Sequence, residues 1–264
     1  MLRRRPTGLA IAVVSLALVL QVIAIAGRPA VARAVSVQSV CPVSSIALAG
    51  LHGTDRGCRF RVMARAADKR VVHEDCTIVG TKRDDILRGT SGKDVICGYK
   101  GDDVIKARGG PDLVYGGSGK DRVRGGPGRD ELQGEEGNDK LVGGADGDDL
   151  FGQLGNDRLL GGGWVDFLAG GYGNDFMSGG PGGDFAFDTF GSDVAELGAG
   201  RDGFESRHGL DVVRAGRGDD FCLTLKDGQP GDIIDGGPGQ DHFDADAGDI
   251  WTGAEVGPQV CNAC

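Results

Sequence analysis

The chain has 264 residues, of which 50 are glycine and only 9 are proline, and its formal net charge is −10. Glycine follows no period of three, which excludes a collagen-like helix, and the acidic balance argues against a nucleic-acid partner. These values taken alone would predict a disordered chain.

The first 34 residues have the pattern of a secretory signal peptide. Arg3 to Arg5 form a charged region, residues 9–26 form an apolar run interrupted by Ser15 and Gln21, and residues 32–34 (Ala-Arg-Ala) fit a small-x-small cleavage site. The alternative is an uncleaved membrane anchor, because the run approaches spanning length. We expect cleavage, which predicts a secreted, extracellular protein with no membrane attachment afterwards.

Residues 35–79 are expected to form a small N-terminal cap tied by disulfides, because cysteines in an exported chain commonly pair. Six of the seven cysteines flank the central region, and their fifteen possible pairings stay open: Cys41, Cys58, Cys76, Cys97, Cys261 and Cys264. The final Cys-x-x-Cys is interpreted as a terminal clip rather than a redox pair or a zinc site, since no accompanying motif surrounds it. Cys222 falls at an inward eighth place of the nine-residue repeat described below and is expected to be a buried free thiol.

An aspartate recurs every nine residues through the centre of the chain, with one interruption of three extra residues at 224–226. An apolar residue follows each aspartate by two positions, and a glycine usually precedes it by two; residues 116–124, for example, read GGSGKDRVR. A fixed period with fixed chemistry predicts one elongated solenoid domain. The series is Asp85, Asp94, Asp103, Asp112, Asp121, Asp130, Asp139, Asp148, Asp157, Asp166, Asp175, Asp184, Asp193, Asp202, Asp211, Asp220, Asp232 and Asp241.

One carboxylate per repeat stacks like charge along the molecule, which indicates a metal ion. Calcium is a hard cation that takes six to eight oxygen ligands from carboxylates and carbonyls. Glycine at places one, two and four of the repeat allows unusual backbone angles and close approach of carbonyls to an ion. In a three-residue strand, place eight points inward and places seven and nine point outward.

The repeat resembles the calcium-binding nonapeptide G-G-x-G-x-D-x-U-x of RTX (haemolysin-type) proteins over eighteen copies, residues 80–244. The resemblance implies an all-β, right-handed parallel β-roll, with calcium held between the loops of repeats n and n+2 and the eighteen aspartates as metal ligands. Residues 245–264 then form a C-terminal tail. Two features depart from the family: the export signal is N-terminal, and no room remains for an effector domain, which puts a toxin or hydrolase activity in doubt.

Several motifs that suggest other chemistry are better explained by the repeat. The GxGxxG match at 198–203 lies inside repeats rather than between a strand and a helix. Adjacent carboxylates such as Asp84 and Asp85 are interpreted as calcium ligation and solvation, not as an acid/base dyad. No HExxH or G-x-S-x-G motif occurs, so no catalytic residue is predicted. Repeats 188–196, 197–205 and 206–214 lack leading glycines, and we expect weaker or absent calcium there.

Sorting outward residues by repeat parity separates two faces. One sheet is predicted to present six basic residues, and the other to present aromatic residues, five in number. Arg122, Lys140 and Arg158 on the basic face are candidate contacts for an anionic cell-wall or matrix polysaccharide, although a solvated surface is the simpler explanation. The aromatic face is expected to be covered by another segment or a second copy.

These observations predict a secreted calcium-binding β-roll protein that acts as a calcium-dependent scaffold for extracellular surface or polymer binding. One alternative is a calcium-dependent polysaccharide-acting enzyme, or a subunit of one, with its active site near residues 188–214. The other is a simple extracellular calcium buffer.

Overall fold

The computed structural model describes residues 35–38, 61–64, 75–225 and 227–253. The predicted signal peptide, most of the predicted cap, the last eleven residues and four of the cysteines (Cys41, Cys58, Cys261 and Cys264) therefore lie outside the described residues. β1 (Val35–Gln38) and β2 (Arg61–Ala64) pair antiparallel in a small sheet of their own. Among the described residues, no helix has the length and apolar character needed to cross a membrane.

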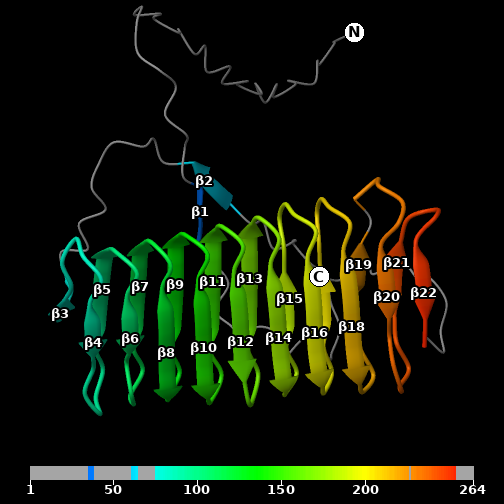
Figure 1. Ribbon diagram of the computed structural model, residues 1–264. Coiled ribbons are helices and arrows are strands. Elements are labelled where there is room, and N and C mark those ends of the chain that lie inside the picture. Colours follow the sequence, from blue (N-terminus) through cyan, green and yellow to red (C-terminus); the bar gives the residue numbers. More distant parts are fainter. Residues whose placement is uncertain (1–34, 39–60, 65–74, 226, 254–264) are drawn as a thin grey trace, which may run out of the picture.

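All other strands belong to two parallel ten-stranded sheets, and the described residues contain no helix (Figure 1). One sheet contains β3 (Ile78–Val79), β5 (Val95–Lys100), β7 (Leu113–Ser118), β9 (Glu131–Glu136), β11 (Asp149–Leu154), β13 (Phe167–Tyr172), β15 (Phe185–Phe187), β17 (Gly203–Glu205), β19 (Leu223–Leu225) and β21 (Phe243–Ala245). The other contains β4 (Ile86–Arg88), β6 (Val104–Lys106), β8 (Arg122–Pro127), β10 (Lys140–Ala145), β12 (Arg158–Gly162), β14 (Phe176–Pro181), β16 (Val194–Ala199), β18 (Val212–Arg217), β20 (Ile233–Asp235) and β22 (Ile250–Thr252).

Consecutive repeats contribute strands to alternate sheets, so each strand pairs with the strand two places away in sequence. β8, for example, pairs with β6 and β10, whereas β9 pairs with β7 and β11. The chain therefore winds as a solenoid whose loops form two long edges (Figure 1). This arrangement confirms the predicted all-β parallel roll and its sorting of repeats by parity.

The eighth-place side chains form the core between the sheets, as the alternation of a strand requires. Leu132, Leu141, Leu150 and Leu159 are each fully buried, and the same row continues in both directions along the roll. Each repeat contributes one such residue, and a few other side chains, Ala107, Leu197, Ala215 and Leu225, add to this thin core. Its stability therefore depends on stacked neighbours, because a single turn buries too little apolar area.

The glycines at the first, second and fourth places of the repeat differ in backbone conformation. Second- and fourth-place glycines have positive φ, as at Gly117 (111°) and Gly119 (139°). First-place glycines such as Gly116 do not appear among the positive-φ residues. Of the two predicted roles of glycine, unusual backbone angles and close approach of carbonyls, only the second applies at the first place, where a Cβ on Gly116 would lie 2.9 Å from the Gly134 carbonyl oxygen.

The three extra residues that interrupt the repeat are not all at 224–226, where the sequence pattern placed them. Leu223 pairs with Phe204 and Phe243 and is fully buried, so it occupies the inward position that Cys222 was predicted to take. Cys222 is nevertheless buried, with φ of 48°. One extra residue therefore precedes Leu223 and the other two follow it, and the left-handed residue absorbs the first insertion as a local bulge.

Both sheets extend past the eighteen repeats. At the start, Ile78 in β3 pairs with Ile96, and a disulfide joins Cys76 to Cys97 with 6.0 Å between their Cα atoms. At the end, β22 pairs with β20. The disulfide links the loop before β3 to β5, which ties the first turn of the roll to the second.

Candidate metal centre

A ladder of hydrogen bonds runs through the sixth-place aspartates along both loop edges. In each rung, Oδ1 of one aspartate accepts the backbone N–H of the aspartate two repeats earlier; Asp148 accepts from Asp130 at 2.8 Å, and Asp139 accepts from Asp121 at 2.8 Å. Sixteen of the eighteen predicted aspartates accept such a bond, at 2.6–3.0 Å. The ladder fixes the carboxylates at even spacing along the roll.

The second oxygen of most of these carboxylates has no hydrogen-bond donor. Within the described residues, Oδ2 is buried and accepts no hydrogen bond in Asp103, Asp112, Asp121, Asp130, Asp139, Asp148, Asp157, Asp166, Asp175, Asp184, Asp188, Asp193, Asp202 and Asp220. A buried carboxylate oxygen without a donor or a cation is costly. A regular row of them points to cations as their partners.

First-place glycines leave a small space beside most of these oxygens. A Cβ atom placed on Gly134 would lie 2.5 Å from Oδ2 of Asp139 and 2.9 Å from the carbonyl oxygen of Gly152. The same construction on Gly116 gives 2.6 Å to Oδ2 of Asp121 and 2.9 Å to the carbonyl of Gly134. A carboxylate oxygen and a carbonyl oxygen from repeats n and n+2 therefore border the same space.

The surroundings of these carboxyls disfavour negative charge and raise their pKa values. Burial raises the pKa of Asp130 to about 7, and burial together with the charges of Asp130 and Asp166 raises the pKa of Asp148 to about 8. Burial raises the pKa of Asp157 to about 8 in the same way. A bound cation would remove this cost, because it stabilises the charged form directly.

This donor set fits calcium. It consists of carboxylate and backbone carbonyl oxygens only, which are the ligands of a hard cation, and no thiolate or imidazole joins the ladder. The sixth-place aspartates and the carbonyls of the first-place residues would hold the ion. Bound calcium would neutralise the stacked carboxylates and link each loop to the loop two repeats later.

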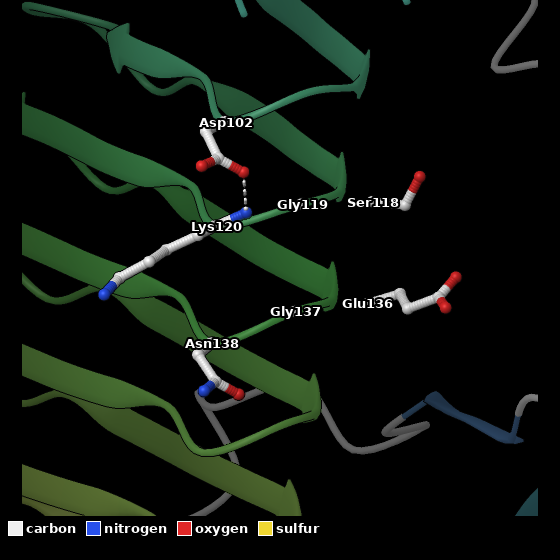
Figure 2. A pocket seen from close by; sticks show the side chains of 7 residues that line it. All are labelled: Asp102, Ser118, Gly119, Lys120, Glu136, Gly137 and Asn138. Carbon is white, nitrogen blue, oxygen red and sulfur yellow. Dashed lines mark hydrogen bonds between the residues drawn. The ribbon is translucent and has the colours of Figure 1, made fainter.

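A second ladder on the fifth-place residues explains the adjacent carboxylate pairs. Oδ1 of Asp84 accepts the backbone N–H of Asp102 at 2.9 Å, and Oδ1 of Asp102 accepts that of Lys120 at 2.8 Å. Figure 2 shows Asp102, Lys120 and Asn138 in line along this loop edge, beside a pocket that Ser118, Gly119, Glu136 and Gly137 also line. Asp84 and Asp85 thus belong to separate ladders.

Not every predicted ligand has a vacant oxygen. Oδ2 of Asp85 accepts the N–H and the hydroxyl of Thr81 at 2.6 and 2.8 Å, and Oδ2 of Asp94 accepts those of Thr90 at 2.6 and 3.0 Å. In these two repeats the threonine supplies hydrogen-bond donors to the oxygen that has no donor in most of the other repeats.

The repeats without leading glycines differ from one another. At the first place of repeat 206–214, the Ser206 hydroxyl donates to Oδ2 of Asp211 at 2.5 Å. Leu197, at the first place of its repeat, is fully buried in the core, and Asp202 keeps a buried Oδ2 without a donor. Asp188 instead brings a third carboxylate next to Asp175 and Asp193.

Sequence reasoning missed two members of the site. Oδ1 of Asp249 accepts the N–H groups of Gly231 at 2.9 Å and Asp232 at 3.2 Å, so the ladder continues beyond the eighteenth repeat. The available signal was Trp251, two residues after Asp249, which pairs with Ile234 in the sheet. Asp188 was missed because it stands at the first place of its repeat, where the sequence pattern predicts glycine and any other residue was interpreted as a weakened calcium site.

Comparison with known families agrees with this geometry. The family described as the RTX calcium-binding nonapeptide repeat (four copies) matches residues 77–105, 98–132, 115–150, 124–159, 151–186, 187–222 and 228–249. These matches cover more than half of the chain, which therefore belongs to the RTX calcium-binding repeat family. The predicted family and its calcium cofactor are confirmed. A search of curated proteins finds no match.

Proposed function

We propose that this RTX-repeat protein is exported, folds on binding extracellular calcium, and then acts as a scaffold that binds an anionic cell-wall or matrix polysaccharide. The calcium-binding β-roll is the basis of the proposal. Low cytosolic calcium would leave the chain unfolded before export, and the higher calcium outside would fold it. Determining the N-terminus of the exported protein tests the first step: a start near residue 35 supports cleavage, and an intact Met1 contradicts it.

The observation that carries the binding proposal is a row of basic side chains on one sheet. Lys140 is the Cα partner of both Arg122 and Arg158, so these three outward side chains stand on neighbouring strands. Strands in a sheet lie about 4.8 Å apart, which sets the spacing of the charges. A parallel row at the ninth place holds Arg88, Lys106 and Arg124.

The two rows lack acidic partners. All six basic residues are exposed, and within the described residues none of them takes part in an ion pair. Like charges at this spacing repel one another, although salt water screens the repulsion to a moderate level. A polyanion that lies across the row would be attracted to all of these charges and would offset their mutual repulsion. The Arg158 guanidinium also rests 4.0 Å from the centre of the Phe176 ring, which holds it above the sheet.

The test compares two variants with equal loss of charge. Arg122→Gln/Lys140→Gln/Arg158→Gln removes the candidate row, and the control Arg129→Gln/Arg207→Gln/Arg214→Gln removes three arginines that already pair with acids, at 3.1, 3.7 and 3.4 Å. Binding to sulfated or uronic-acid polysaccharides is measured in calcium at several salt concentrations. The first variant should bind roughly tenfold or more weakly with a flatter salt dependence, and the control should bind nearly as well as the parent.

Equal binding by both variants, with calcium-induced folding intact, overturns the assignment of the basic row. No binding by the parent protein to any acidic polysaccharide favours the calcium-buffer alternative. Release of new chain ends from a polysaccharide in calcium would instead support the enzyme alternative.

A further inference from the structure

The irregular repeat that begins at Asp188 contains a cluster that differs from the rest of the ladder. Carboxylate oxygens of Asp175, Asp188 and Asp193 all lie within 4.8 Å of one another. We propose that these three aspartates form a three-carboxylate calcium site that binds its ion more tightly than the other positions of the roll. The inference rests on calcium binding by the repeats and is independent of polysaccharide binding.

The local backbone directs Asp188 into the roll. It follows β15 directly, and its N–H donates to the carbonyl of Glu205 at 2.9 Å, as a first-place residue in a regular repeat would. Its Oδ1 accepts the N–H of Gly171 at 3.0 Å. The side chain is fully buried, so the carboxylate is fixed on the inside of the loop edge rather than in solvent.

The position of Asp188 matches the position of a metal ligand in a regular repeat. The space beside Gly134 is bordered by Oδ2 of Asp139 and by the carbonyl oxygen of Gly152. The space beside Gly170 is bordered by Oδ2 of Asp175 and by Oδ1 of Asp188. A carboxylate therefore stands where the regular repeat presents a neutral carbonyl.

Each of the three carboxylates has one buried oxygen, Oδ2, that accepts no hydrogen bond from a donor group of the described residues. Asp175, Asp188 and Asp193 are 3 %, 0 % and 1 % exposed, and within the described residues Oδ2 of each accepts no hydrogen bond. Calcium binds oxygens at 2.3–2.6 Å, so oxygens separated by up to about 5 Å can share one ion. The separation in the cluster falls within that limit.

The extra carboxylate raises the affinity because charge count is one of the main determinants of calcium affinity at oxygen sites. One carboxylate oxygen and one carbonyl oxygen border the regular space, whereas two carboxylate oxygens border this one and the carboxylate of Asp193 lies within 4.8 Å of both. Like-charge repulsion between three buried carboxylates is also larger without an ion, so the ion relieves more repulsion here. This site should therefore fill first as calcium rises.

In a competing interpretation, Asp188 is protonated and uncharged and fills the space of the ion, which we call the filler interpretation. Ser206 occupies the equivalent place two repeats later, and its hydroxyl already satisfies Oδ2 of Asp211. A protonated Asp188 sharing its proton with Asp193 would satisfy the site in the same way and would exclude an ion. The two interpretations predict opposite effects when Asp188 is replaced.

The experiment counts calcium ions bound to the full chain in chelator-buffered solutions by equilibrium dialysis, with circular dichroism as the folding readout. Asp188→Asn keeps the shape without the charge, and Asp188→Gly restores the regular repeat. Ser206→Asp places a carboxylate at the equivalent position next to Asp211. Asp149→Asn, a partly exposed residue paired with Arg129, is the matched control.

The parent should bind one ion at a free calcium concentration on the order of tenfold lower than the rest. Asp188→Asn and Asp188→Gly should lose this first step, Ser206→Asp should gain a second one, and Asp149→Asn should change nothing. An unchanged curve for Asp188→Asn, or an increase in bound calcium for Asp188→Gly, overturns the proposal in favour of the filler interpretation. If the Asp188 variants do not fold at saturating calcium, the Ser206→Asp variant decides the question. The proposal is overturned if this variant does not bind an additional calcium ion at low free calcium.

Discussion

The backbone N–H of Asp130 donates to Oδ1 of Asp148, 18 residues later, at 2.8 Å. Along most of the roll, this contact makes a sixth-place aspartate both a donor through its backbone and an acceptor through its side chain, and it links each loop to the loop two repeats later. It leaves Oδ2 of both residues buried without a donor. A bound cation would supply the missing partner of this second oxygen in both residues.

The calcium-free chain should be largely disordered near neutral pH. The thin core cannot offset the repulsion and desolvation of the stacked carboxylates. Adding calcium should produce β structure cooperatively near ~0.1–1 mM, as for extracellular modules. Magnesium should fail, because it demands small octahedral sites and retains its waters. Circular dichroism measures the transition, and an unchanged β signal in excess chelator would contradict metal-coupled folding.

Individual aspartates should differ in a way that the geometry ranks. Asp130→Asn removes charge where Oδ2 is unsatisfied and should cost at least one bound ion, whereas Asp211→Asn changes an oxygen that Ser206 already satisfies. The missing glycines had predicted a small effect for Asp202→Asn, but its Oδ2 is also buried without a donor, so we expect an effect close to that of Asp130→Asn. Calorimetric calcium titration compares the three variants, and equal losses in all of them would refute the ranking.

Trp164→Gly should stabilise the calcium-bound roll. Trp164 stands at a fourth place with φ of 79°, where most repeats have glycine, and it is 70 % exposed. A left-handed backbone costs a non-glycine residue about 1–2 kcal/mol, and glycine gives back part of this through its larger unfolded-state entropy. A net gain of roughly 0.5–1 kcal/mol is expected.

The matched variant is Gly173→Ala, also at a fourth place, with φ of 124° and with the Gly155 carbonyl next to the added Cβ. It should lower stability. Thermal unfolding in saturating calcium measures both variants. Destabilisation by Trp164→Gly would mean that the tryptophan makes a contact worth more than its backbone strain.

The fold followed from the sequence because its period is local and strict. Leu132 had to face inward once Asp130 was assigned to the loop, and every later repeat repeats the same constraint. Cys222 is a buried thiol, as predicted, but its predicted inward eighth place was wrong because an insertion can be divided around a strand. Only pairing with Phe204 shows that Leu223 occupies the inward position.

The site was harder to predict than the fold. The nine-residue pattern identifies Asp148 as a ligand, but it cannot show that Thr90 already satisfies Asp94 or that Ser206 satisfies Asp211. These contacts depend on side-chain direction at the first two places of the repeat, which the period does not determine. The same holds for Asp188. The absence of glycine at the first place indicates that less space is left for an ion, but it does not show that the carboxylate of the replacing residue points toward Asp175 and Asp193.

The last prediction concerns pH. The pKa of Asp130 rises to about 7 and that of Asp148 to about 8 in the metal-free fold, from the ordinary value of 3.8, chiefly because burial disfavours the charged form. The folded state therefore holds these protons more tightly than the unfolded chain does. Below pH 3.8 these carboxyls are protonated in both the folded and the unfolded state, so their ionisation does not affect the stability of the calcium-free fold. Between pH 3.8 and 8 the carboxyls of the unfolded chain ionise first, and the stability of the calcium-free fold falls as the pH rises.

In excess chelator the chain should thus show the most β structure in acid and should lose it as the pH rises toward 8. Calcium reverses the trend, since it requires ionised carboxylates, and the calcium midpoint should increase as the solution is acidified. Circular dichroism against pH, with and without calcium, measures both trends. The variant Asp130→Asn/Asp148→Asn removes two titrating groups and should flatten the calcium-free curve, whereas Asp149→Asn at a partly exposed position should leave it unchanged. A calcium-free signal that stays constant across this range would show that the buried carboxyls do not control folding.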